Sequence, residues 1–346
     1  MLIALLIAAA APQPAPSPAQ AAPVPREAHL FHDWVVACDN GRHCQAVAVH
    51  SESQGFTANG IMAIERGPEP EARIRFRIAQ VEGTPARLTV YGQPLAVRLE
   101  GVDGDVLIEP ENLRSFLDET GYADLIELQD AAGTMIGQVS LKGMRGAMLY
   151  MDEVQGRLHT TTALIRTGRN PASEVPPPPP VPVVRLARSA SEPALAIPAA
   201  RIARLRRDNG CAIDDVGGPD EVETAALGGG RTLVLIACGT GAYNVTNVPF
   251  IATPQGPEIR IAPAPFDIAL DDIDVEEGHR MLVNAEWDGD SMILSDFSKG
   301  RGLGDCGSRS RYGWDGSRFR LIAREEMPEC RGSILYVTTW RAEVQR

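Results

Sequence analysis

Alternating and continuous apolar runs indicate that the first half of the chain is rich in strands. Residues 73–78 alternate three arginines with Ile74, Phe76 and Ile78, which is the two-residue period of a strand with one wet and one buried face. The Asp-Asn-Gly sequence at residues 39–41 lies between two apolar runs and predicts a hairpin. The remaining runs predict strands over residues 31–37, 45–49, 61–65 and 87–91.

The period changes to that of a helix later in this half. Met144, Ala147, Met148 and Met151 follow the i, i+3, i+4, i+7 spacing, which predicts a helix with a methionine-rich face in the core. Two further helices are predicted over residues 111–119 and 199–207, the second of them basic.

The second half returns to strand patterns. A strand is predicted over residues 232–237, and two Trp-Asp-Gly sequences predict successive hairpins over residues 287–294 and 314–321. The expected fold class is therefore mainly β with a few helices (α+β).

Five consecutive prolines, residues 176–180, divide the chain into two parts. Such a run adopts the extended polyproline II conformation and acts as a stiff spacer. We therefore predict two β-rich domains, residues 27–168 and 196–346, the second a meander, joined by a Pro-rich linker over residues 169–195. A chain of 346 residues is long enough for both.

The N-terminus begins with 11 apolar residues that precede an Ala/Pro-rich stretch. The run is shorter than the roughly 20 residues that cross a bilayer, and it matches the apolar region of a secretory signal. No Lys or Arg precedes it, and no nearby Cys favours a lipid anchor. We expect a signal peptide over residues 1–21 and a periplasmic or secreted protein with no membrane span after its removal.

The cysteines fit this location, because an even number in an exported chain predicts disulfides. No Cys-x-x-Cys pair indicates a zinc ribbon or a redox site. If each domain keeps its cross-links internal, Cys38 pairs with Cys44. In the second domain Cys211 precedes the strand that ends at Cys238, and Cys306 and Cys330 flank a predicted hairpin, so the expected pairs follow the order of the chain. They are Cys38–Cys44, Cys211–Cys238 and Cys306–Cys330.

Charge and motifs exclude several function classes. The net charge of −12 argues against a nucleic-acid-binding protein. His29, His32, Asp33 and His43 are candidate metal ligands, but strand alternation would place residues 29 and 32 on opposite faces. The acidic segment 267–277 lacks the glycine and final glutamate of a calcium loop, and neither a Walker motif nor a Gly-x-Ser-x-Gly elbow occurs. We expect no metal and no cofactor.

A glycine-rich loop at residues 299–307 provides the candidate binding surface. Glycines let a partner approach the backbone, and arginines bind anions through a planar fork. The candidate residues are Arg301, Gly302, Gly304, Asp305 and Arg331. The alternative is that both arginines pair internally, with Asp305 or Asp315.

Several segments together resemble an uncharacterised family of exported proteobacterial proteins, known only as a domain of unknown function. Its motifs include Phe31-His-Asp-Trp-Val-Val-Ala-Cys38-Asp-Asn, Ser140-Leu-Lys-Gly, Met151-Asp-Glu-Val-Gln-Gly-Arg157, Gly300-Arg-Gly-Leu-Gly-Asp-Cys306-Gly and Cys330-Arg-Gly332. The first domain also resembles the invasion-associated locus B family. These resemblances imply an envelope location and no particular reaction.

Two function classes remain open. The first is a non-catalytic envelope protein that binds a protein or a glycan, which the lack of a nucleophile–base motif favours. The second is an envelope hydrolase with carboxylates from separate segments, such as Asp305 with Asp315, or Asp33 with His43. An inhibitor of such hydrolases is a specific form of the first class. A deep pocket with two acids would favour the enzyme, and a surface lined by arginines and aromatic rings would favour binding.

We expect the mature protein to begin near Ala22, because signal cleavage follows small residues of the kind found at positions 19–21. Intact-mass measurement of the exported protein tests this. A native protein that retains residue 2 would contradict it.

Overall fold

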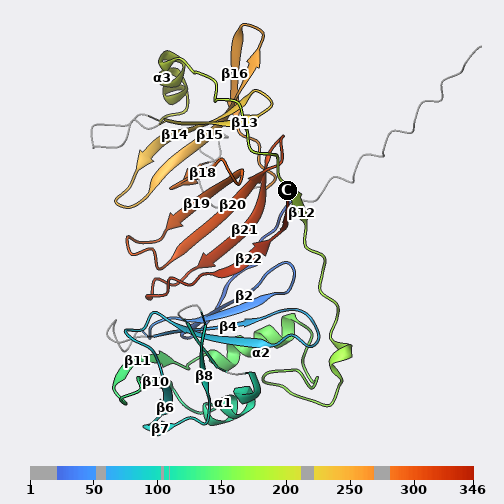
Figure 1. Ribbon diagram of the computed structural model, residues 1–346, viewed down its shortest axis with the longest axis vertical. Helices are drawn as coiled ribbons and strands as arrows, with labels where there is room; N and C mark the ends of the chain where they lie inside the picture. Colours follow the sequence, from blue (N-terminus) through green and yellow to red (C-terminus); the bar gives the residue numbers. More distant parts are fainter. Residues whose placement is uncertain (1–21, 52–59, 103–104, 109, 212–221, 269–280) are drawn as a thin grey trace, which may run out of the picture.

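The computed structural model describes residues 22–51, 60–102, 105–108, 110–211, 222–268 and 281–346. The predicted signal peptide lies outside these ranges, as does most of the acidic segment. The described residues form several antiparallel sheets and few helices, which confirms the mainly β, α+β fold class. The sheets are stacked in layers, with the two sheets of the second half above the large sheet of the first half (Figure 1).

The first half contains a seven-stranded sheet in the order β1-β2-β3-β4-β5-β9-β8 and a four-stranded sheet in the order β11-β10-β6-β7. Its elements are β1 (His29–Phe31), β2 (Trp34–Cys38), β3 (Cys44–Ala48), β4 (Ile61–Arg66), β5 (Ile74–Ala79), β6 (Arg87–Val90), β7 (Gln93–Pro94), β8 (Leu99–Val102), β9 (Asp105–Ile108), η1 (Pro110–Asn112), α1 (Leu113–Glu119), β10 (Leu125–Gln129), β11 (Met135–Ser140) and α2 (Met144–Val154).

The large sheet is covered on one face by α2, whose methionine stripe lies in the core as predicted. Trp34 is fully buried in this core and donates from Nε1 to the carbonyl of Ser140 at 2.9 Å. Val35 and Ala37 point from β2 to the opposite face, where they are also buried. The unbroken apolar sequence of β2 follows from this double burial, since no position of the strand meets water.

One predicted strand is corrected. Residues 31–37 were expected to form one strand, but the chain turns at His32 and Asp33, where His32 has a φ of 52°. Of the candidate ligands, His29 therefore lies in β1 and His32 in the turn that follows it. Apolar runs on both sides conceal this turn, because the two residues between β1 and β2 are not glycine or proline.

A buried ionic network joins the end of α2 to the rest of the first half. Asp152 accepts hydrogen bonds from the backbone N–H groups of Leu164 and Ile165 and pairs with Arg66 at 3.2 Å. Arg157 donates to the backbone carbonyls of residues 67, 69 and 70. Burial raises the pKa of Asp152 and lowers that of Arg66 to about 10. Asp152 and Arg157 of the 151–157 motif therefore connect the end of α2 to residues 66–70 and 164–165.

The second half contains the sheet β13-β14-β15-β16, with β17 added to β15, and the meander β18-β19-β20-β21-β22. Its elements are α3 (Ala199–Asp208), β13 (Val222–Gly228), β14 (Arg231–Thr240), β15 (Val245–Gln255), β16 (Glu258–Pro263), β17 (Leu282–Val283), β18 (Glu286–Asp288), β19 (Ile293–Lys299), β20 (Gly307–Trp314), β21 (Phe319–Met327), β22 (Val337–Arg341) and β23 (Glu343–Gln345). The two predicted Trp-Asp-Gly hairpins are the β18–β19 and β20–β21 turns.

The Pro-rich segment runs beside both halves from the bottom of the molecule to the top (Figure 1). It contains η2 (Ala172–Glu174) and β12 (Val183–Arg185), which pairs in parallel with the C-terminal strand β23. Val184 and Leu186 are buried against Ile322. This segment therefore packs on the second half over part of its length, and the predicted domain limits stay a prediction.

The three disulfides join Cys38 to Cys44, Cys211 to Cys238 and Cys306 to Cys330, so the predicted pairing is confirmed. Such cross-links fit a protein outside the cytoplasm. Among the described residues, no helix has the length and apolar character to span a membrane.

We expect Asp152→Asn to lower the free energy of unfolding by about 3 kcal/mol, because it leaves the buried Arg66 guanidinium without its counter-charge. Urea unfolding measures the change. The exposed neighbour Glu153→Gln is the matched control and should change stability by less than about 0.5 kcal/mol. Equal effects of the two substitutions would contradict the structural role of Asp152.

Candidate functional site

The two halves of the chain share a buried apolar contact, which we call the seam. Val35, Ala37 and Val47 from the large sheet meet Val337 and Met327 from β22 and β21, and none of the five side chains is more than 2% exposed. Burial of this kind stabilises an interface in proportion to its apolar area. The seam therefore fixes the position of the meander relative to the first sheet.

Polar contacts extend the seam on both sides. The Asp39 carboxylate accepts hydrogen bonds from the N–H groups of Gly41 and His43 and lies 2.7 Å from Arg341 Nε. Asn40 exchanges two hydrogen bonds with the backbone of Arg341. The N–H of Thr338 donates to the Gln45 side chain at 2.8 Å. The predicted Asp-Asn-Gly hairpin is therefore the element that docks on β22.

A second ionic group, which we call the clasp, consists of Asp33, Arg301, Asp305 and Arg331. Arg331 crosses between the halves: its Nη1 donates to Asp33 at 2.8 Å and its Nη2 to the His32 carbonyl at 2.6 Å. Ser140 Oγ donates to the other oxygen of Asp33 at 2.6 Å. Asp33 is thus held from both halves.

Asp305 organises the glycine-rich loop within the clasp. It accepts two hydrogen bonds from Arg301 and one from the Gly332 N–H at 2.7 Å, and it is 2% exposed. The bonds from Arg301 lower the pKa of Asp305. Gly307 adopts a φ of 126° and would clash with the Ser298 carbonyl if it carried a Cβ, so the loop requires glycine there.

The sequence-predicted surface is therefore brought together, with its charged members turned inward. Arg301 pairs with Asp305, as the internal alternative described, whereas Arg331 pairs with Asp33 and Glu329. Gly304 accepts a hydrogen bond from Tyr336, and Gly302 lies beside the Tyr243 ring. These residues support a neighbouring groove, and their role as a contact surface stays a prediction.

The groove lies next to the seam and consists of two adjoining hollows of about 310 and 240 Å³, which share Arg309 and Glu325. The larger hollow follows the meander face and is lined by residues that include Glu286, Ser295, Phe297, Lys299 and Arg311. The smaller one lies between the halves and adds Gln45, Glu65 and Arg77 from the large sheet.

The Arg309 guanidinium contacts two aromatic rings at the junction of these hollows. Its guanidinium carbon is 4.4 Å from the centre of the Phe297 ring and 4.1 Å from that of Tyr336. The rings are edge to face, 5.9 Å apart, and Tyr336 donates to the Gly304 carbonyl. Burial raises the pKa of Tyr336 to about 12, so it remains a donor. The two cation–π contacts restrict the position of the guanidinium.

Three cations of the groove have no acidic partner among the residues that the structure describes. Arg309 has only its two ring contacts, Lys299 lies 5.5 Å from the Phe297 ring centre, and Arg311 is exposed. None forms an ion pair within that part of the chain. Glu325 of β21 is the register partner of Arg309 on the neighbouring strand β20, yet the two side chains form no ion pair within the described ranges. The groove therefore presents positive and negative side chains to a ligand.

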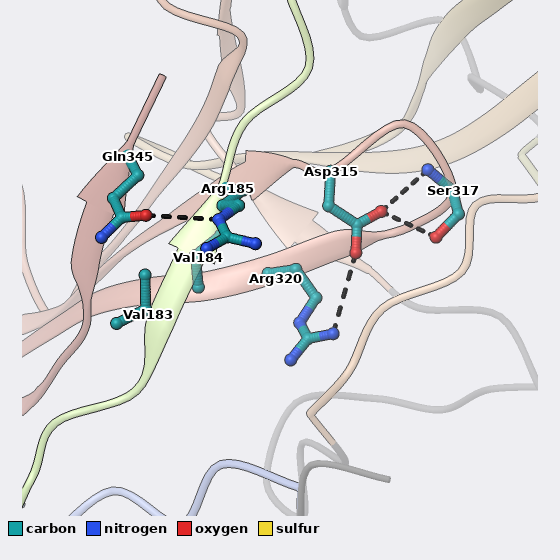
Figure 2. A pocket seen from close by; sticks show the side chains of 7 residues that line it. All are labelled: Val183, Val184, Arg185, Asp315, Ser317, Arg320 and Gln345. Carbon is teal, nitrogen blue, oxygen red and sulfur yellow. Dashed lines mark hydrogen bonds and ion pairs between the residues drawn. The ribbon is translucent and has the colours of Figure 1, made fainter. Parts of the chain in front are cut away.

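A different hollow, of about 480 Å³, lies beside β12 and the C-terminus (Figure 2). Its charges are engaged within the chain: Asp315 accepts two hydrogen bonds from Ser317 and lies 3.7 Å from Arg320, which also contacts Asp267 at 2.8 Å. Arg185 donates to Gln345 at 3.2 Å. The charged groups of this hollow therefore have partners within the chain. The groove, whose cations have no acidic partner among the described residues, is the better candidate site.

The acid–base pairs considered from the sequence are not brought together. Asp305 and Asp315 flank the eight-residue strand β20, which separates them by more than about 20 Å. Asp33 and His43 lie at opposite ends of the β2–β3 hairpin. His29 packs on Tyr150, and the described residues contain no group of three or more potential metal ligands.

The sequence carries one local signal of the groove, which is the alternation of arginine and serine over residues 308–311. Arg309 and Arg311 alternate with Ser308 and Ser310 in a strand that is otherwise part of a core, so they share one face with Phe297 and Lys299 of the adjacent strand. The contribution of Gln45, Glu65 and Arg77 depends on the seam and carries no local signal.

Comparison with known proteins gives a relationship over nearly the whole chain. A family model described as "Protein of unknown function (DUF1176)" matches residues 28–343. The "Uncharacterized protein YpfG" of Escherichia coli strain K12 is 31% identical over 352 aligned positions, which cover 92% of this chain and 93% of that protein. No solved structure matches. The similarity to the invasion-associated locus B family stays a prediction.

We expect Asp305→Asn to destabilise the protein by about 2 kcal/mol at neutral pH, because Arg301, whose side chain is one third exposed, loses its charged hydrogen-bond partner. The pKa of Asp305 is lowered in the folded state, so its stabilising effect is present above its ordinary value of 3.8 and disappears as the pH falls through the folded-state value.

Unfolding free energies measured between neutral and strongly acidic pH test this. The difference between wild type and variant should shrink below about pH 4. Asp118→Asn, an exposed substitution on α1, is the control. A difference that is independent of pH would show that the Asp305 carboxylate is not the stabilising group.

Proposed function

Since the chain belongs to the DUF1176 family of proteins of unknown function, we propose that it is an exported, non-catalytic binding protein of the bacterial envelope and that the groove is its binding site. The observation that carries the proposal is the Arg309 guanidinium, which lies over the Phe297 and Tyr336 rings without an acidic partner among the described residues. Arginine and aromatic side chains in a preformed hollow are the residues that dominate binding energies.

The surroundings support a binding role. Three cations without an acidic partner among the described residues lie within one hollow of a chain with a net charge of −12. The hollow is built on strands whose other face is core, so its shape is fixed before a ligand arrives. Preorganisation of this kind reduces the entropy lost on binding.

The location in the envelope rests on separate observations. Three disulfides fit an oxidising compartment, and the N-terminal sequence resembles a secretory signal. The hydrolase alternative lacks a comparable observation, because the acids proposed for it lie far apart along β20 or along the β2–β3 hairpin.

Hydrogen–deuterium exchange of the mature protein tests the proposal. The probe is a periplasmic extract of Escherichia coli, which encodes the 31% identical relative, separated by ultrafiltration into small solutes and macromolecules. We expect one fraction to slow exchange in β19, β20 and residues 334–337, and Arg309→Gln to abolish this protection.

The matched control is Arg260→Gln, which makes the same chemical change at an exposed position of β16 outside the groove. It should keep the protection. Protection that survives in Arg309→Gln, or that appears only around the hollow of Figure 2, would contradict the assignment of the site.

A further inference from the structure

The charges of the groove form a pattern that restricts the chemistry of its ligand. Lys299, Arg309 and Arg311 project from one face of two adjacent strands, with residues 309 and 311 about 7 Å apart along the strand. Phe297 lies directly opposite Arg309 in the register and Ser295 directly opposite Arg311. The three cations therefore surround a small surface with one ring and one hydroxyl.

Two carboxylates line the same hollow and are also without ion pairs among the described residues. Glu325 lies across from Arg309 in the register, and Glu286 lies across from Ser295 on the edge strand β18. Each carboxylate is therefore a neighbour of the cation cluster, on a different side of it. A phosphate or another compact dianion on the arginines would be repelled by both glutamates.

We propose that the groove recognises a short peptide segment that carries both a carboxylate and an ammonium group. The carboxylate binds Arg309 and Arg311, assisted by Lys299, and the ammonium group binds Glu325 or Glu286. This inference rests on the proposed binding function and names its ligand class. A planar guanidinium fork is suited to a carboxylate, and the two ring contacts restrict the position of the Arg309 fork.

The dimensions agree with a small ligand segment. The larger hollow, at about 310 Å³, is at the lower end of the range for small-molecule sites. The second hollow continues it past Arg309 and Glu325 toward Gln45 and Glu65. An extended segment can lie along both, with its charged groups at the junction.

Isothermal titration of the mature protein with defined tripeptides tests the inference. Two mixed-charge probes separate the sources of the charges: Glu-Ala-Lys with blocked ends carries them on side chains, and Gln-Ala-Gln with free ends carries them on its termini. Blocked Glu-Ala-Glu and Lys-Ala-Lys and inorganic phosphate are the comparison ligands. We expect at least one mixed-charge peptide to bind about tenfold more tightly than every comparison ligand.

Three variants assign the roles. Arg309→Gln should weaken the mixed-charge peptide about tenfold, and either Glu325→Gln or Glu286→Gln should remove its advantage over Glu-Ala-Glu. Arg260→Gln should leave all affinities unchanged. Equal or tighter binding of phosphate or Glu-Ala-Glu to the wild type would overturn the inference, as would an affinity that Arg309→Gln does not change.

The two experiments show separately whether the ligand class or the binding function itself is wrong. If the envelope extract protects the groove but no tripeptide binds, the site is right and the ligand class is wrong. If neither the extract nor any peptide acts on the groove, both proposals fail.

Discussion

The burial of strand β2 on both faces is the constraint on which the arrangement of the molecule depends. Trp34 and Val36 face the core beneath α2, while Val35 and Ala37 face the meander of the second half. A strand with two apolar faces cannot be left exposed on either side, so the first half requires the second as its cover. The two halves are therefore parts of one packed structure, in spite of the proline-rich segment between them.

The polar contacts around the seam fix how the two halves are oriented, which apolar packing alone leaves loosely specified. Asp33, Asp39 and Gln45 of the first half each meet a group from residues 331–341. Charged hydrogen bonds depend strongly on geometry, so these contacts favour one docking position over its neighbours. The segments that carry the family resemblance, around residues 31–44, 140–143, 300–307 and 330–332, converge on this region, which indicates that much of the motif content serves assembly.

Local structure was largely predictable because it follows from local patterns. The helices over 144–151 and 199–207 and the two Asp-Gly hairpins rest on spacing within a few residues, and the disulfide pairs follow from turns and hairpins that close short loops. The turn at His32 was missed because a non-glycine residue takes a positive φ there, supported by Asp33, which the clasp holds. That support comes from Arg331, about 300 residues away in sequence.

The candidate site was predicted only in part, for the same reason. Sequence reasoning found the glycine-rich loop but not the direction of its side chains, because the contacts of Asp305 with Arg301 and Gly332 join segments that are about 30 residues apart. The groove depends on Arg309, Glu325 and Tyr336 together with Gln45 and Glu65, which the seam brings to one place. No sequence pattern within either half specifies that these residues come together.

The overall charge of the protein bears on how such a groove selects its ligand. The net charge of −12 repels anions that approach the protein surface, which opposes the attraction of the three groove cations. At physiological salt both effects are screened beyond about one Debye length, roughly 8 Å. A ligand with a strong net negative charge therefore meets both repulsion and attraction close to the surface. A ligand with balanced charges experiences little net repulsion and still gains the short-range contacts to Arg309 and Glu325, which is the physical reason that a mixed-charge segment suits this site better than a simple anion.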